Sequence, residues 1–288
     1  MTTIHHRYAT VRGQKLFYQE SGPADAPVVV LLHGFPTSSF MFRNLIPVLA
    51  DRYHVIAPDH LGFGLSDMPS VDDFDYTFDA LADLTAELLA QLEVTRYAMY
   101  VQDYGAPVGW RLALADPESV TAIISQNGNA YEAGFAEGFW KPLRAYWAEK
   151  SPETETALRQ ALTLDVTRWQ YLHGVPDESL VNPDTWYHDF ALLSRPGNDL
   201  VQLKLFADYA SNFELYPRVH AYLRESRVPV LAVWGRNDEI FLPEGALAFA
   251  DDSPDAEISL LNGGHFLLES HLDTAASTIL QFLGRTLK

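Results

Sequence analysis

The chain has 288 residues, 48% of them hydrophobic and 20% charged, the balance of one large folded domain or of a domain that carries an insertion. A formal net charge of −18 disfavours nucleic acid and anionic membrane surfaces as partners. Because the chain contains no cysteine, disulfides, thiolate metal sites and thiol catalysis are excluded. Residues 1–8 lack the apolar core of a signal peptide, and the longest apolar stretch, Val28–Leu32, is too short to span a bilayer, so we expect a cytoplasmic protein.

Strand-like and helix-like segments alternate over roughly the first 125 residues. Short apolar runs predict buried strands at Val28–Leu32, Tyr53–Pro58, Tyr97–Val101 and Val120–Ser125. Helical periodicity predicts helices over Phe78–Leu92, with Thr77 as its N-cap, and over Ala106–Ala115. Such alternation is typical of an α/β fold with a mostly parallel sheet flanked by helices.

The pattern changes between Tyr131 and Arg227, where aromatic residues are dense and no buried parallel strand stands out. We interpret residues 131–227 as a helical cap inserted into an α/β core made of residues 1–130 and 228–288. Alternation then resumes, with strands predicted at Val230–Trp234 and Glu257–Leu261 and a final helix from Leu272 to Leu287. A cap of this kind covers the carboxyl ends of the strands, where ligands bind, and its aromatic residues predict a small, largely apolar substrate.

A sharp strand-to-helix turn is predicted at Asp103, directly after the strand that begins at Tyr97. Gly105 supplies the close packing that such a nucleophile elbow needs. A carboxylate in the nucleophile position attacks a saturated carbon and forms an alkyl ester, whereas a serine attacks a carbonyl and forms an acyl ester. Serine-type ester hydrolysis would need a serine in this turn, and Ser125 lacks the elbow pattern.

Three further motifs follow predicted strands and complete a catalytic set. The backbone amide of Phe35, in His33-Gly-Phe-Pro, is a candidate oxyanion donor together with the amide of Tyr104. Asp238 and His265 follow the last two strands, and the chain order Asp103, Asp238, His265 is that of nucleophile, acid and base.

A fourth glycine-containing segment, residues 59–66, lacks the phosphate-loop pattern, and we interpret it as a structural turn.

Together these motifs resemble the α/β-hydrolase superfamily, in the branch of epoxide hydrolases and of haloalkane and fluoroacetate dehalogenases that use an aspartate nucleophile. The resemblance spans essentially the whole chain and rests on His33-Gly-Phe-Pro, Asp59-x-x-Gly-x-Gly-x-Ser66, Gln102-Asp-Tyr-Gly105, Trp234-Gly-x-x-Asp238 and Gly264-His-Phe266. It implies attack by Asp103, hydrolysis of the ester by water that His265 activates, and no metal or organic cofactor. Val101 departs from the family, which usually has a small residue there.

The resemblance also implies cap residues that hold the leaving group. Tyr216 matches the second of two tyrosines that epoxide hydrolases use, and the first matches either Arg168 or, three residues on, Tyr171. Fluoroacetate dehalogenases hold the fluoride with three cap residues, and the counterparts in this chain would be Arg168, Trp169 and Tyr216. For Arg168 we favour a structural ion pair with Asp165. The predicted activity is epoxide hydrolysis, and dehalogenation is the alternative. A non-catalytic binding protein is a third hypothesis. Substrate size and oligomeric state stay open.

Overall fold

A computed structural model describes residues 3–287, so Met1 and Thr2 of the amino-terminal segment and Lys288 lie outside the described residues. Within that range the strands form one sheet in the order β1-β2-β4-β3-β5-β6-β7-β8. Neighbours from β4 to β8 in this order are parallel, and only the pairs that involve β1 and β2 are antiparallel. The mostly parallel α/β sheet predicted from the sequence is therefore confirmed. The strands are β1 (His5–Val11), β2 (Gln14–Ser21), β3 (Val28–Leu32), β4 (His54–Pro58), β5 (Tyr97–Gln102), β6 (Val120–Gln126), β7 (Val230–Gly235) and β8 (Glu257–Leu261).

The hairpin of β1 and β2 was missing from the predicted elements. Its two-residue turn is Arg12-Gly13, and both residues have positive φ angles, 48° and 80°. This backbone suits the twist of an antiparallel hairpin. Most side chains of β1 are exposed, so no apolar run marked this edge strand in the sequence.

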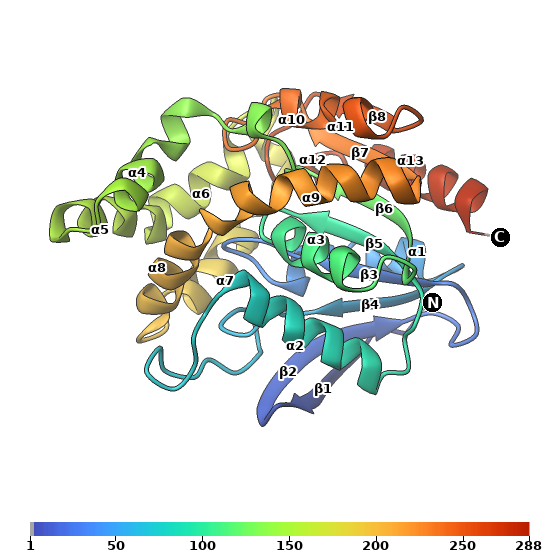
Figure 1. The fold of residues 1–288 in the computed structure, drawn as a ribbon, viewed down its shortest axis with the longest axis horizontal. Helices are drawn as coiled ribbons and strands as arrows, with labels where there is room; N and C mark the ends of the chain where they lie inside the picture. The colour runs from blue at the N-terminus through green and yellow to red at the C-terminus, as the bar shows by residue number, and fades with distance from the viewer. Residues whose placement is uncertain (1–2, 288) are drawn as a thin grey trace.

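Helices cover both faces of the sheet (Figure 1). Helix α2 (Phe78–Gln91), α3 (Gly105–Ala115) and α9 (Ser211–Ser226) pack on one face, and α1 (Ile46–Leu49) and α13 (Leu272–Thr286) pack on the other. Alternate residues of β3 enter the two separate cores, as the period of a strand requires. The predicted cap of α2 is confirmed, because the Thr77 hydroxyl accepts a hydrogen bond from the Ala80 amide at 3.1 Å.

The long segment between β6 and β7 contains helices, and an isolated bridge joins its Phe135 to Phe241, which follows β7. Its last helix, α9, returns to pack on α3 beside the sheet (Figure 1). The other elements of the segment are η2 (Glu132–Gly134), α4 (Glu137–Ala148), α5 (Pro152–Arg159), η3 (Gln160–Leu162), α6 (Leu164–Leu172), η4 (Glu178–Leu180), α7 (Asp184–Leu193) and α8 (Asn198–Asp208). That residues 131–227 work as a lid stays a prediction.

Short helices occupy the remaining connections: η1 (Ser39–Phe42), α10 (Pro243–Leu247), α11 (Phe249–Asp252) and α12 (Leu267–Ser270). None of the helices found between residues 3 and 287 has both the length and the apolar character that a membrane span requires.

The loop after β4 is a structural turn, as predicted. The buried carboxylate of Asp59 accepts hydrogen bonds from the backbone amides of Ser39 and Leu65, both at 2.7 Å. It thereby ties the loop after β4 to η1, which follows the His33-Gly-Phe-Pro loop. This support holds the loop that carries Phe35 in place.

Candidate active site

Strand β5 ends in a strained turn that presents Asp103 at the carboxyl edge of the sheet. The backbone of Asp103 has a φ of 47°, a left-handed conformation that costs a non-glycine residue about 1–3 kcal/mol. The turn closes tightly on its surroundings: a Cβ on Gly105 would lie 2.1 Å from the carbonyl oxygen of Leu32, and one on Gly34 would lie 2.3 Å from the Cβ of Asp103. Both positions therefore exclude any side chain, and the turn has the geometry of the elbow expected from the sequence.

Val101, the departure from the family pattern, is accommodated by two neighbouring glycines. A Cβ on Gly109 would lie 2.6 Å from Cγ1 of Val101, and one on Gly128 would lie 3.1 Å from Cγ2. Because Gly109 of α3 and Gly128 of the loop after β6 have no side chains, there is room for Val101, which is fully buried. The bulkier residue does not prevent the turn.

The two backbone amides proposed as oxyanion donors converge on one oxygen of the nucleophile. The N–H groups of Phe35 and Tyr104 each donate to Oδ1 of Asp103 at 2.6 Å. Charge-assisted hydrogen bonds of this kind are short and strong, so they fix the plane of the carboxylate. Its second oxygen, Oδ2, lies 3.9 Å from Nε2 of His265. One oxygen is anchored and the other is available to react.

The loops after β7 and β8 bring the predicted acid and base together. Nδ1 of His265 lies 2.9 Å from Oδ2 of Asp238, whose other oxygen accepts a hydrogen bond from the Ile240 amide at 2.7 Å. Asp103, Asp238 and His265 are 5%, 2% and 2% exposed. Three residues that are far apart in the sequence therefore meet in one buried site.

The sequence analysis missed polar residues that support this set. The side-chain amide of Asn127 donates to Oδ2 of Asp238 at 2.7 Å and accepts from the Gly235 amide at 3.2 Å. The amide of Gln126 donates to the backbone oxygen of His265 at 3.0 Å. The available signal was a run of polar residues after the apolar part of β6, a place where buried polar groups need partners.

Burial and neighbouring charges shift the ionisation of the nucleophile and of the base. Burial raises the pKa of Asp103 to about 6, and His265 and the amides of Phe35 and Tyr104 limit the rise. For His265, burial lowers the pKa, but Asp238 and Asp103 raise it by more, so it ends above its ordinary value. At neutral pH the nucleophile is therefore ionised, as a displacement reaction requires.

We expect Asp103→Asn to stabilise the protein at pH 8. The folded state holds the Asp103 proton up to about pH 6, whereas an unfolded chain releases it near pH 4, so stability falls as pH rises through this window. Above the window the ionised carboxylate costs about 2–3 kcal/mol. Thermal unfolding of the variant at pH 8 should show a melting temperature a few degrees higher, and the gain should vanish near pH 4. A gain that does not depend on pH would contradict the assignment.

Three of the four predicted cap residues are engaged elsewhere. The Tyr171 hydroxyl donates to the buried carboxylate of Asp189 at 2.5 Å, and its ring stacks on Phe266. Arg168 is exposed, with its guanidinium over the Trp186 ring, and among the described residues it forms no ion pair with Asp165. Trp169 stacks on Phe139 and His173. An exposed Arg168 offers no positive charge to an anionic substrate inside the buried site.

Tyr216, the fourth predicted cap residue, is buried, and beside it lies Tyr209, which the sequence analysis missed. Burial raises the pKa of both hydroxyls; Tyr216 raises that of Tyr209 further, whereas Tyr209 lowers that of Tyr216. Neither hydroxyl has a hydrogen-bond partner within the described residues. The ring of Tyr209 packs 5.8 Å from that of Tyr104 and 4.8 Å from that of Trp140. Burial and then Tyr216 and Asp103 raise the pKa of Tyr209 well above its ordinary value, so its hydroxyl stays protonated within the field of the nucleophile. Tyr209 directly follows α8 and Tyr216 lies in α9, so the pairing depends on how these two helices meet and has no periodic signal in the sequence.

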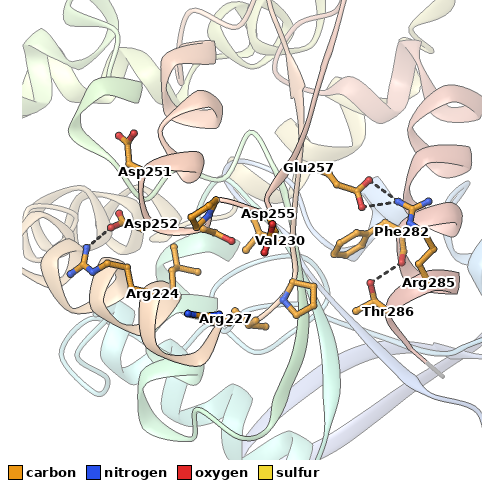
Figure 2. A pocket seen from close by; sticks show the side chains of 15 residues that line it. Arg224, Arg227, Val230, Asp251, Asp252, Asp255, Glu257, Phe282, Arg285 and Thr286 are labelled. Atoms are coloured by element: carbon orange, nitrogen blue, oxygen red, sulfur yellow. Dashed lines mark hydrogen bonds and ion pairs between the residues drawn. The ribbon is translucent and has the colours of Figure 1, made fainter.

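A large surface hollow lies at the opposite edge of the sheet (Figure 2). Val230 and Glu257, the first residues of β7 and β8, line it together with Arg224, Arg285 and Asp252. Two ion pairs, Arg224 with Asp252 and Arg285 with Glu257, neutralise much of its charge. The catalytic set follows the carboxyl ends of the strands, so this hollow belongs to another part of the molecule.

Comparisons with known proteins identify the family and show proteins that share the fold. The model of a family described as the alpha/beta hydrolase fold matches residues 27–272. An uncharacterized hydrolase of Saccharomyces cerevisiae is 43% identical over 280 residues, 96% of this chain and 95% of that protein. A haloalkane dehalogenase of Bradyrhizobium diazoefficiens is 28% identical over 295 residues, 96% of this chain and 93% of that protein. The solved structure of an epoxide hydrolase, CorEH, shares the fold, with a TM-score of 0.78 at 21% identity over 98% of this chain and 99% of that chain.

Proposed function

Because this chain belongs to the α/β-hydrolase fold family, we propose that it is a hydrolase in which Asp103 attacks carbon, and that its substrates are small epoxides. The observation that carries the proposal is the Asp103 carboxylate, which has one oxygen anchored by two backbone amides and the other free. A general base would need no such anchoring, whereas an ester's carbonyl oxygen does.

In the first step Oδ2 of Asp103 displaces the epoxide oxygen from one ring carbon. The new bond joins Oδ2 to that carbon, and the electron pair of the broken bond goes to the epoxide oxygen. One of the two unpartnered hydroxyls, of Tyr209 or Tyr216, gives its proton to this oxygen and becomes a phenolate, while the other donates a hydrogen bond to it. The ester that results keeps Oδ1 as its carbonyl oxygen between the amides of Phe35 and Tyr104.

In the second step His265 takes a proton from water at Nε2, and the hydroxide adds to the carboxyl carbon of Asp103. Negative charge then develops on Oδ1, which two N–H donors already hold. Asp238 accepts the proton on Nδ1 in a hydrogen bond and stabilises the imidazolium. The bond between the carboxyl carbon and Oδ2 breaks, His265 returns its proton to Oδ2, and the diol leaves. The proton of the added hydroxide then passes from the new carboxyl group to the phenolate, so Asp103 is again a carboxylate and both tyrosines are again protonated.

Two features of the site support an epoxide, the first against a halide and the second against an acid. Phenol hydroxyls are proton donors, and an alkoxide leaving group needs a donor more than a halide does. Within residues 3–287, no arginine is among the main groups that shift the pKa of Asp103, and Arg168 is exposed. An anionic substrate would therefore bring an unpaired charge into a buried, aromatic environment.

Dehalogenation of an uncharged alkyl halide is the alternative, favoured by the same pair of hydroxyls. A displaced halide accepts hydrogen bonds from O–H groups without taking a proton, so Tyr209 and Tyr216 would suit it as well. The route through an ester on Asp103 is common to both reactions.

A single turnover in water enriched in the heavy oxygen isotope tests the aspartate mechanism. Enzyme in excess is mixed with styrene oxide or butyl bromide, and the product and the Asp103 peptide are weighed. We expect the heavy oxygen in Asp103 and none in the first product, because the product takes Oδ2 from the enzyme. A labelled product with an unlabelled peptide would mean that water attacks the substrate directly, and would refute the proposal.

A further inference from the structure

Gln102, the residue before the nucleophile, lies against the base. It is the last residue of β5 and is fully buried, and its side-chain Nε2 lies 2.9 Å from Nε2 of His265. Its carbonyl oxygen, Oε1, is buried without a hydrogen-bond partner. Buried amide oxygens without partners are uncommon and costly, so this one calls for an explanation.

The protons on His265 determine what this contact is. Asp238 accepts a hydrogen bond from Nδ1, so the neutral ring carries its lone pair on Nε2. The Gln102 amide donates to that lone pair. A separation of 2.9 Å leaves no room for a water molecule between the two nitrogens. The water that His265 must deprotonate therefore competes with Gln102 for the same position.

We propose that Gln102 is a positioning residue for ester hydrolysis: its amide nitrogen holds the base until water enters, and its carbonyl oxygen then orients that water for His265. This inference rests on the proposed two-step mechanism.

An amide suits this task because it carries a donor and an acceptor on one rotatable group. The donor matches the neutral base. Once His265 has taken the water proton, Nε2 bears a hydrogen, and a rotation of the amide presents Oε1 as its acceptor. Oε1 of Gln102, which has no partner in the resting site, thus gains a hydrogen-bond donor during turnover. The water gives one proton to Nε2 of His265, and the hydroxide that remains adds to the carboxyl carbon of Asp103.

The other groups around His265 stay in place when Gln102 is replaced, so the effect of Gln102 on the His265 pKa can be measured separately. The charged groups that act on the ring are Asp103 and Asp238, and the rings of Phe241 and Phe266 are its apolar neighbours. A donor on the lone pair favours the neutral ring and lowers its pKa. Removing the donor should therefore raise the pKa of His265, without any change of charge in the site.

The test compares Gln102→Leu and Gln102→Glu with Gln202→Leu as the matched control. Gln202 is likewise fully buried and has an unpartnered carbonyl oxygen, and its amide contacts Asn198 on the same helix. The first readout needs no substrate: nitrogen NMR of labelled histidine follows the titration of His265, identified by its loss in His265→Ala. We expect a higher His265 pKa in Gln102→Leu, a still higher one in Gln102→Glu, and no change in Gln202→Leu.

The second readout separates the two chemical steps. With styrene oxide and butyl bromide, Gln102→Leu should form the ester within about threefold of the normal rate and hydrolyse it about tenfold to a hundredfold more slowly. The ester should then accumulate on Asp103. An unchanged His265 pKa, or an equal slowing of both steps, would overturn the role of Gln102. An ester trapped by His265→Ala, with no effect of Gln102→Leu on its decay, would reject this inference and leave the proposed function standing. If His265→Ala traps no ester from either probe, the proposed function fails, and with it this role in hydrolysis.

Discussion

Replacing His265 by alanine is expected to lower turnover by about a thousandfold while an ester accumulates on Asp103. The nucleophile keeps its two backbone amides in this variant, so the displacement step remains possible. Water then lacks the base that activates it. The measurement is the mass of the Asp103 peptide after incubation with styrene oxide, butyl bromide and fluoroacetate in separate reactions.

The mass gained identifies the reaction. A gain equal to the whole epoxide would establish ring opening, and a gain equal to the bromide less HBr would establish dehalogenation. An adduct from fluoroacetate would contradict the exclusion of acids and point to a cation that the buried site does not offer in this conformation. Asp103→Ala is the control and should carry no adduct. An adduct on another residue, or none with any probe, would refute Asp103 as the nucleophile.

Replacing Tyr209 by phenylalanine is expected to slow ester formation from styrene oxide by about a hundredfold. The substitution removes one hydroxyl and keeps the ring that packs on Tyr104 and Trp140. Ester hydrolysis should stay within about threefold, since the hydroxyl acts on the leaving oxygen of the first step. Rapid mixing in a His265→Ala background measures the first step alone, because the ester does not decay there.

Tyr222→Phe is the matched control for this variant. The Tyr222 hydroxyl is also buried without a partner, and the residue lies on the same helix as Tyr216. The control should leave both steps unchanged. Tyr216→Phe should fall between the two. If Tyr209→Phe behaves like the control, the leaving group is held by some other donor.

Much of the core and of the catalytic set was accessible from the sequence, because both depend on local features. A buried parallel strand is a short apolar run, and an enzyme of this architecture places its reactive residues just after such runs. The elbow is local too, since Gly105 follows Asp103 within two residues. The hairpin β1–β2 was missed for the converse reason: β1 is an exposed edge strand and has no apolar run.

The support of the catalytic set was less accessible. Gln102, Gln126 and Asn127 are polar residues at strand ends, and a sequence does not show which backbone or side-chain atoms lie opposite them. Asn127 contacts Asp238 across 111 positions of the chain, and Gln102 contacts His265 across 163. Such contacts follow from the order of strands in the sheet.

By itself the sequence determined the α/β core, the inserted helical segment and the chain order of Asp103, Asp238 and His265, because runs of apolar residues and glycine positions encode them locally. Only the tertiary structure decided which partners the cap tyrosines have. Tyr171 and Tyr209 are both buried at helix ends, but one hydroxyl meets Asp189 and the other lies in the field of Asp103. A tyrosine has an apolar ring that any core accepts, and the partner of its hydroxyl depends on how the helices dock.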